Sequence, residues 1–222
     1  MAQYETGIQT RNQILEACRS LFYEKGFDAT TYVDIAKRAG VNQGSIHYHY
    51  ASKENLLKII LDETISKNNS IVDDYAAEDT ADFTKYFLSI ELYLYKMALD
   101  GKYRQFNLDA SRLLSPENFN DLLNSQSNQY YDGRNYSALP LSEQFEVMAC
   151  LAFDIIVRIF FVQHIENSDY QEIKENCLDI YRRIMKIDDA EIEIVKQQLS
   201  VLESKVPWDG LDTTLDPTKK YL

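Results

Sequence analysis

The stretch from Thr30 to Lys53 constrains the fold more than any other part of this sequence. Thr31 is a good N-cap, and Asp34 follows three residues later, where its carboxylate can reach back to the free backbone N–H groups. Gly40 supplies the left-handed residue that ends a helix. Asn42 can then cap a second short helix. Two short helices joined by a turn that contains glycine predict a helix-turn-helix.

The second of these helices presents polar and aromatic groups on its outer face. A helical projection places Ile46 and Tyr50 together, pointing inward. The outer side chains offer an amide, a hydroxyl, imidazoles and a phenol, which can hydrogen-bond base edges or phosphates. Gly44 allows a DNA strand to approach closely, and the helix that opens at Lys53 has an N-terminus suited to phosphate. The residues expected to contact DNA are Thr31, Tyr32, Gln43, Gly44, Ser45, His47, Tyr48, His49 and Lys53.

An ordered set of residues across the first 55 or so positions carries a family resemblance. The set comprises Thr10, Arg11, Ile14, Leu15, Leu21, Phe22, Gly26, Phe27, Thr30, Thr31, Ile35, Ala36, Ala39, Gly40, Val41, Gly44, Ser45, Tyr48, His49, Ser52, Lys53 and Glu54. This pattern resembles the DNA-binding domain of the TetR family of transcriptional regulators. Two positions depart from it, because His47 stands where the family commonly has tyrosine and Tyr50 where it commonly has phenylalanine.

The charge is unevenly divided along the chain. The net charge of −12 arises from 23 lysine and arginine residues against 35 aspartate and glutamate residues. Residues 1–55 hold six basic and six acidic side chains, so the whole excess of acid lies in residues 56–222. An acidic body repels DNA, so attraction must come from a local patch such as Lys37, Arg38 and Lys53. This division predicts modest non-specific affinity and a strong dependence on salt.

Composition excludes several other classes of protein. No apolar run in the chain approaches the roughly 18 residues that a membrane-spanning helix needs, and the N-terminus has no signal-peptide core. We therefore expect a cytoplasmic protein that does not associate with a membrane. Cys18, Cys150 and Cys177 are far apart in apolar stripes, which favours reduced core thiols. Phosphate-binding glycine loops, nucleophile elbows and HExxH or CxxC patterns are missing, so we expect neither enzyme activity nor a metal or cofactor site. A metal site at His47 and His49 is disfavoured by their spacing on a helix.

Helical periodicity continues through the rest of the chain, and only 7 glycines and 4 prolines interrupt it. Further helices are expected at about 8–25, 52–69, 80–100, 103–113, 115–130, 142–165, 169–186 and 188–203. The predicted fold is therefore all-α. It has an N-terminal three-helix helix-turn-helix domain at 1–52 and a helical ligand-binding and dimerisation domain at 53–203. An irregular C-terminal tail at 204–222 follows, which Trp208 would pin to the body.

The two late helices carry more apolar surface than a monomer needs to bury. In the TetR family the corresponding helices form a four-helix bundle with a second copy, so the resemblance implies a two-fold homodimer. The residues expected at this interface are Leu151, Ile155, Ile159, Ile173, Ile180 and Ile184. Arg158 lies within the apolar run and is expected to pair with Asp154 one turn earlier; an acidic ligand or the dimer partner are the alternatives.

Aromatic residues are concentrated in the middle helices and suit the lining of a small-molecule pocket. The pocket residues expected are Phe87, Tyr93, Phe106, Phe119, Tyr130 and Phe153. Taken singly, each is more often a core residue, and it is the resemblance that favours a ligand pocket for the group. The resemblance implies a repressor that binds a palindromic double-stranded operator and is released by a small-molecule effector. The alternative is a DNA- or protein-bound interaction protein of the same fold that acts without a ligand.

Overall fold

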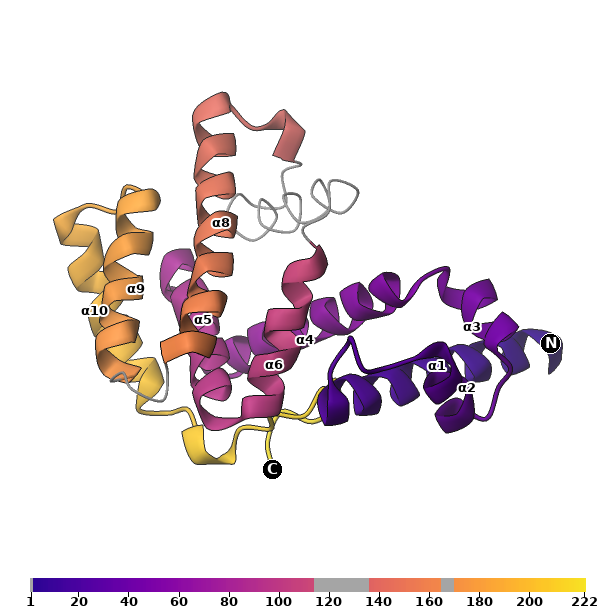
Figure 1. The fold of residues 1–222 in the computed structure, drawn as a ribbon. Coiled ribbons are helices and arrows are strands. Elements are labelled where there is room, and N and C mark those ends of the chain that lie inside the picture. The colour runs from indigo at the N-terminus through magenta and orange to yellow at the C-terminus, as the bar shows by residue number, and fades with distance from the viewer. Residues whose placement is uncertain (1, 114–135, 165–169) are drawn as a thin grey trace.

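The computed structural model describes residues 2–113, 136–164 and 170–222, which form helices joined by turns (Figure 1). In these ranges the extended structure is limited to an isolated bridge between Leu211 and Tyr221. The prediction of an all-α fold is confirmed. A small N-terminal helical unit lies at one side of a larger helical body, and one long helix runs from the first into the second (Figure 1).

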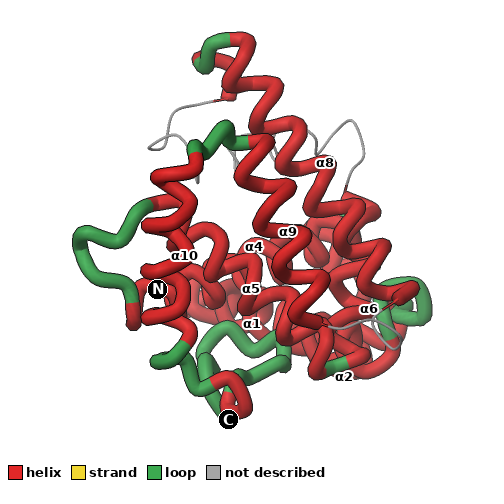
Figure 2. The backbone as a smooth tube through the Cα atoms, turned by 90° about the vertical axis from the view of Figure 1, so that its left-hand side faces the viewer, coloured by secondary structure: helices red, strands yellow, loops and turns green. Residues whose placement is uncertain are grey.

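The helix bounds follow the predicted pattern closely. The N-terminal unit contains α1 (Ala2–Lys25), α2 (Tyr32–Ala39) and α3 (Gln43–Tyr50), and α4 (Lys53–Tyr75) connects it to the body. The body contains α5 (Asp82–Leu99), α6 (Gly101–Asp109), α8 (Leu141–His164), α9 (Tyr170–Ile184) and α10 (Asp189–Glu203), with 3₁₀ turns at Ala110–Leu113, Tyr136–Ala138 and Trp208–Gly210. Figure 2 shows α8 and α9 side by side along one face of the body.

Three boundaries differ from the prediction. Helix α1 begins at Ala2, earlier than residue 8, and α4 continues to Tyr75. The break expected between the helices at 80–100 and 103–113 falls at Asp100, and Gly101 is the first residue of α6, because the Asp100 side chain caps that helix through the N–H groups of Lys102 and Tyr103. The helix expected at 115–130, with Phe119 and Tyr130, lies outside the described residues, and so do the side chains of Asp154 and Arg158.

The core of the N-terminal unit fixes which face of α3 is free. Ile14 and Phe22 of α1, Ile35 of α2 and Ile46 of α3 are buried together, with Leu56 at the start of α4. Burial of each such side chain contributes about 1.5–3 kcal/mol. Because Ile46 anchors α3 from below, the opposite side of this helix must face solvent.

Helix α6 fastens the N-terminal unit to the body at both of its ends. At its start, the Tyr23 hydroxyl of α1 donates to Asp100. At its end, the backbone N–H of Phe27 donates to Asp109 Oδ2 over 2.8 Å in a buried contact. These two carboxylates therefore hold the end of α1 and the turn that follows it against the body.

A buried lysine lies deeper in the body. The Lys96 side chain is almost fully enclosed, and its ammonium donates to Asn68 Oδ1 over 2.9 Å. Burial and the neighbouring Lys67 cation lower the pKa of Lys96 to about 7, and Asp212 only partly opposes this change. The positive charges of Lys67 and Lys96 are thus both opposed by the single buried carboxylate of Asp212, which contacts Lys67 directly.

Replacing this lysine is expected to stabilise the protein. In the unfolded chain Lys96 keeps its proton up to its usual pKa of 10.5, whereas the folded protein releases it near 7, so stability rises with pH between these values. Lys96→Met should raise the free energy of unfolding at pH 7 by about 1–3 kcal/mol. Its advantage over wild type should shrink at pH 9. Urea titrations at both pH values, with the exposed Lys205→Met as control, measure the difference; a constant advantage would contradict the lowered pKa.

Candidate nucleic-acid interface

The start of α2 is held by a capping box. The Asp34 N–H donates to Thr31 Oγ1 over 3.2 Å, and the Thr31 N–H donates back to Asp34 Oδ2 over 2.9 Å. The Lys25 ammonium, 2.7 Å from the same carboxylate, and the Thr31 donors together hold the pKa of Asp34 well below its usual range. Gly40 ends α2 with a left-handed φ of 68°. The local chemistry of the predicted turn is therefore present.

Helix α3 presents a solvent-facing surface over a buried anchor. Ile46 and Tyr50 are 1% and 4% exposed, and the Tyr50 hydroxyl donates to the carbonyl of Arg11 in α1 over 2.8 Å. By contrast, the Tyr48 side chain is 86% exposed. Of the other residues expected to contact DNA, Thr31, Gln43, Gly44 and His47 are exposed, whereas Tyr32, Ser45, His49 and Lys53 are partly buried. Hydroxyl, amide, imidazole and phenol groups thus gather on one rigid helix.

Tyr32 connects three elements of this surface. Its hydroxyl accepts a hydrogen bond from the backbone N–H of Lys53 over 2.9 Å, and its ring lies 4.4 Å from that of His47, centroid to centroid. The His47 ring also contacts the Ala51 carbonyl at 3.3 Å. These contacts therefore join the start of α2, the end of α3 and the start of α4.

Lys53 has a structural role that its sequence pattern did not indicate. Its ammonium donates to the carbonyls of Phe27 and Thr30, each over 2.8 Å, and lies 4.1 Å from the centroid of the Phe27 ring. Two of its three N–H groups are thereby used inside the domain. A direct contact between this ammonium and phosphate stays a prediction.

The expected basic patch is only partly assembled. Arg38 forms two hydrogen bonds to the Glu24 carboxylate, at 3.0 and 2.8 Å, so its charge is balanced on the domain. Glu24 lies 14 residues away, and nothing in the sequence marked this pair. Lys37 is exposed and has no ion pair among the described residues. An attraction to DNA at this surface would therefore have to depend on Lys37, on polar side chains and on backbone N–H groups more than on a cluster of cations.

In the expected complex with DNA, the salt dependence of affinity would distinguish a structural role of Lys53 from a contact between Lys53 and phosphate. Lys53→Met keeps the side-chain stem but removes the ammonium that holds the turn before α2. We expect affinity for the operator to fall roughly tenfold, about 1.4 kcal/mol. The slope of log K against log salt should stay unchanged, because no phosphate contact is lost. A loss of about 0.9 in that slope, the change we expect for a Lys37→Met control, would instead assign Lys53 to a phosphate.

The described aromatic candidates fall into two groups in the body. Phe87 and Phe153 both meet the buried Tyr181 ring, at centroid distances of 6.5 and 4.7 Å. Tyr93 packs beside Tyr103 at 6.5 Å, and Phe106 is buried in the same core. The four described candidates thus belong to one hydrophobic core, in two separate sets of ring contacts, and Phe119 and Tyr130 lie outside the described residues.

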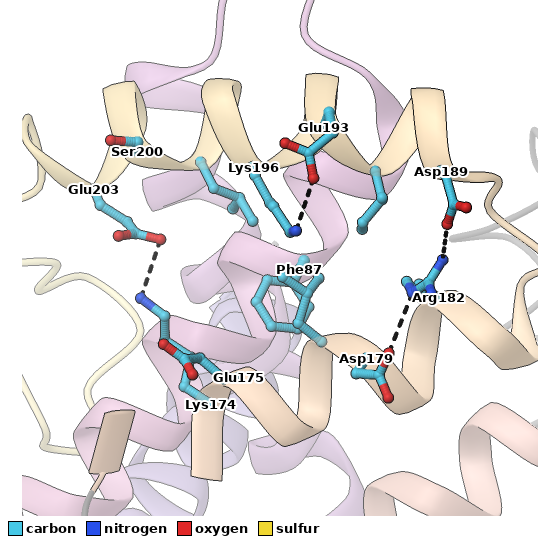
Figure 3. Close-up of a pocket in the computed structure, with 13 residues that line it drawn as sticks. Phe87, Lys174, Glu175, Asp179, Arg182, Asp189, Glu193, Lys196, Ser200 and Glu203 are labelled. Carbon is cyan, nitrogen blue, oxygen red and sulfur yellow. Dashed lines mark hydrogen bonds and ion pairs between the residues drawn. The ribbon is translucent and has the colours of Figure 1, made fainter. Parts of the chain in front are cut away.

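A charged groove opens between α9 and α10 above α5 (Figure 3). Its volume is about 630 Å³, and Phe87 lies at its floor. Ion pairs bridge it at its two ends, Lys174 to Glu203 over 3.2 Å and Arg182 to Asp189 over 3.1 Å. Ion pairs therefore connect these two helices across the groove.

The late helices place the predicted interface residues at different depths. Leu151 and Ile173 are buried inside the monomer, Ile155 and Ile184 are partly buried, and Ile159 and Ile180 are exposed.

Helix α8 nevertheless carries an exposed apolar stripe at helical spacing. We define the α8 stripe as Leu141, Phe145, Met148, Ala152, Ile156, Ile159 and Phe160.

Two other kinds of site are not found in the part of the chain that the structure describes. Histidine, cysteine and carboxylate side chains there form no group of three or more that could hold a metal ion. None of the helices in these ranges combines the length and apolar character needed to span a bilayer.

Comparison with known proteins agrees with this geometry. The family model described as "Bacterial regulatory proteins, tetR family" matches residues 14–60. The regulator TtgR of Pseudomonas putida is 32% identical over 104 residues, which cover 46% of this chain and 50% of TtgR. The repressor KstR2 of Mycobacterium tuberculosis is 41% identical over 70 residues, covering 30% of this chain and 35% of KstR2. A TetR-family regulator structure from Shewanella sp. PV-4 superposes with a TM-score of 0.52 at 18% identity, covering 78% of this chain and 95% of that one.

The fold and the exposed face of α3 define a helix-turn-helix unit joined to a helical body. Residues 14–60 match the model of the TetR family of bacterial regulatory proteins, and the N-terminal part of the chain is similar to regulators of that family. The chain spans about half the length of the first curated relatives that it matches.

Proposed function

We propose that this protein is a dimeric transcriptional repressor that binds a palindromic operator through α3 and is released by a small-molecule effector. The observation that carries the proposal is the outward face of α3. A core-anchored helix presents hydrogen-bonding and aromatic groups with little local charge, and this combination suits reading of base edges in a major groove. The proposed units are a reading domain at 1–52, an effector and dimerisation domain at 53–203 and a C-terminal segment at 204–222.

The α8 stripe supports the dimer. Large apolar side chains at spacings of three and four residues remain exposed along this helix in the monomer; Ile156, for example, is 60% exposed. A second copy related by a two-fold axis would cover the stripe with the same surface. The same axis would place two α3 helices on successive major grooves about 34 Å apart, which explains why the operator should be palindromic.

The effector is proposed to act through the aromatic core and α4. Some relatives are named as repressors, and one is named the A-factor receptor of Streptomyces griseus. A ligand that prefers the arrangement with low DNA affinity would shift the population toward it, and such couplings are typically about 1–3 kcal/mol. Helix α4 would couple effector binding in the body to the position of the reading domain, since it runs from one into the other.

The alternative function is regulation of DNA or protein partners without a small molecule. A DNA-bound form of this alternative would bind DNA as the repressor does, so the discriminating measurement is operator affinity in the presence of candidate effectors. A ligand-free regulator would keep a constant affinity across a panel of small apolar and aromatic compounds.

The experiment that tests the proposal starts from the intact protein. Sheared genomic DNA from the source organism is captured on purified protein at about 0.15 M salt, where non-specific binding is weak, and sequenced. A short near-palindrome is the expected product. Enrichment of no sequence by a folded, dimeric protein would contradict the assignment as an operator-binding repressor.

A further inference from the structure

The last 19 residues follow a definite path across the domain junction. We call residues 204–222 the C-terminal strap. In Figure 1 the strap, in yellow, leaves α10 and passes beneath the body to the region where α1 and α6 meet. It closes on itself, because the Asp212 N–H donates to the Lys220 carbonyl over 3.0 Å and the Leu222 N–H donates to the Gly210 carbonyl over 2.7 Å.

The strap binds α4 through a buried ion pair. Lys67 of α4 and Asp212 of the strap lie 2.6 Å apart, and their side chains are only 3% and 2% exposed. The same ammonium also donates to the carbonyls of Thr214 and Asp216, over 2.9 and 3.0 Å. All three N–H groups of Lys67 therefore point into the strap.

A second ion pair holds the strap further along the same helix. The Lys220 ammonium lies 2.7 Å from Asp74 Oδ2 and donates to the Ser70 carbonyl over 3.1 Å. The Tyr221 hydroxyl lies 3.2 Å from that of Tyr75. The second half of α4 is thus held at two levels by residues that come last in the chain.

The strap also reaches the reading domain through one shared carboxylate. Thr213 Oγ1 donates to Asp100 Oδ2 over 2.7 Å, and the same oxygen accepts the hydrogen bond from Tyr23 of α1. The other oxygen of Asp100 caps α6. Adjacent strap residues, Asp212 and Thr213, therefore contact the helix that links the domains and the carboxylate that fastens α1.

We propose that the C-terminal strap is a conformational latch that fixes the angle between the reading domain and the body. Its buried contacts join α1, α4 and α6 in one arrangement, so their release allows the reading domain to adopt a range of angles. Its effect on DNA affinity rests on the proposed function. In a dimer whose two α3 helices are not held at one spacing, the reading domains must become ordered when the operator binds, and this loss of conformational freedom weakens the affinity.

The test measures the domain angle directly. Spin labels at Gln43→Cys in α3 and Glu193→Cys in α10 report the distance between domains; both sites are exposed, whereas the native thiols of Cys18, Cys150 and Cys177 are buried. Labelled chains are diluted into excess unlabelled protein so that each distance lies within one chain. Operator affinity is measured on unlabelled protein.

Asp212→Asn, which leaves Lys67 without its counter-charge, should broaden the distance distribution and weaken operator binding roughly tenfold. Thr213→Val should change the distance distribution and the operator affinity in the same direction, with a smaller effect, and it does not alter the charge. If the Asp212→Asn protein does not fold, Thr213→Val is the variant that tests the latch. The matched control is Asp209→Asn, because Asp209 lies in the strap but, within the described ranges, its side chain accepts a hydrogen bond only from Tyr95 of α5, at 3.2 Å. The control should keep the wild-type distribution.

The outcomes separate this proposal from the one on which it rests. Folded Asp212→Asn or Thr213→Val protein with the narrow wild-type distribution would overturn the latch. A broadened distribution in a protein whose wild type selects no operator would support the latch and refute the repressor.

Discussion

An Ile156→Asp variant is expected to be a monomer and to lose on the order of 100-fold or more in operator affinity. Ile156 lies within the α8 stripe and is 60% exposed, so the carboxylate is hydrated in the monomer and costs little stability there. In a two-fold dimer, two copies of this carboxylate would be taken out of water without partners. Each half of the operator would then be bound by a separate molecule, and the gain from joint binding would be lost.

Light scattering at micromolar concentration, together with an operator titration, measures both effects. Ile194→Asp is the matched control, because Ile194 is 53% exposed on α10, outside the α8 stripe. It should remain dimeric and bind DNA like wild type. If Ile156→Asp were still a dimer, the interface would have to lie elsewhere on the body.

Tyr48→Ala is expected to weaken operator binding by roughly 10- to 100-fold, about 1.4–2.8 kcal/mol, with almost no change in stability. The ring is 86% exposed, and its recorded ring contact is an edge-on approach to His49 at 5.0 Å, so removing it leaves no cavity. The loss would arise from a missing contact to a base or phosphate.

The companion variant Tyr48→Phe divides this effect between ring and hydroxyl. Affinity near that of wild type would show that the ring is the contacting group, whereas a loss as large as that of the alanine variant would assign the contact to the hydroxyl. Thermal unfolding of both variants serves as the control. Wild-type affinity of the alanine variant would mean that this face of α3 does not contact DNA.

Local chemistry explains which parts of the structure were predictable. The capping boxes at Thr31 with Asp34 and at Asp188 with Glu191 involve residues three apart, so the sequence alone contains both partners. The left-handed end of α2 at Gly40 depends on a single residue in the same way. Helix periodicity likewise identified the buried side of α3, because Ile46 and Tyr50 are one turn apart.

Contacts between distant residues account for what was missed. The ion pair of Lys67 with Asp212 joins positions 145 residues apart, and the inward turn of Lys53 depends on carbonyls more than 20 residues earlier. The expectation of an irregular tail described its backbone well, since the strap contains one short 3₁₀ turn and one isolated bridge. The expected attachment of Trp208 to the body is present, since its ring lies 5.1 Å from that of Tyr95 on α5. The packing of Asp212 and Lys220 against α4 was not predicted, because their partners there lie 145 and 146 residues earlier in the chain.

The α8 stripe has a consequence for how such a protein responds to its own abundance. If two chains must associate before either reads DNA, the population able to occupy an operator grows with the square of the chain concentration whenever monomers predominate. Halving synthesis would then reduce the active species about fourfold. As cell growth dilutes the protein, the fraction of operator that is occupied would therefore fall more steeply than it would for a regulator that binds as a single chain.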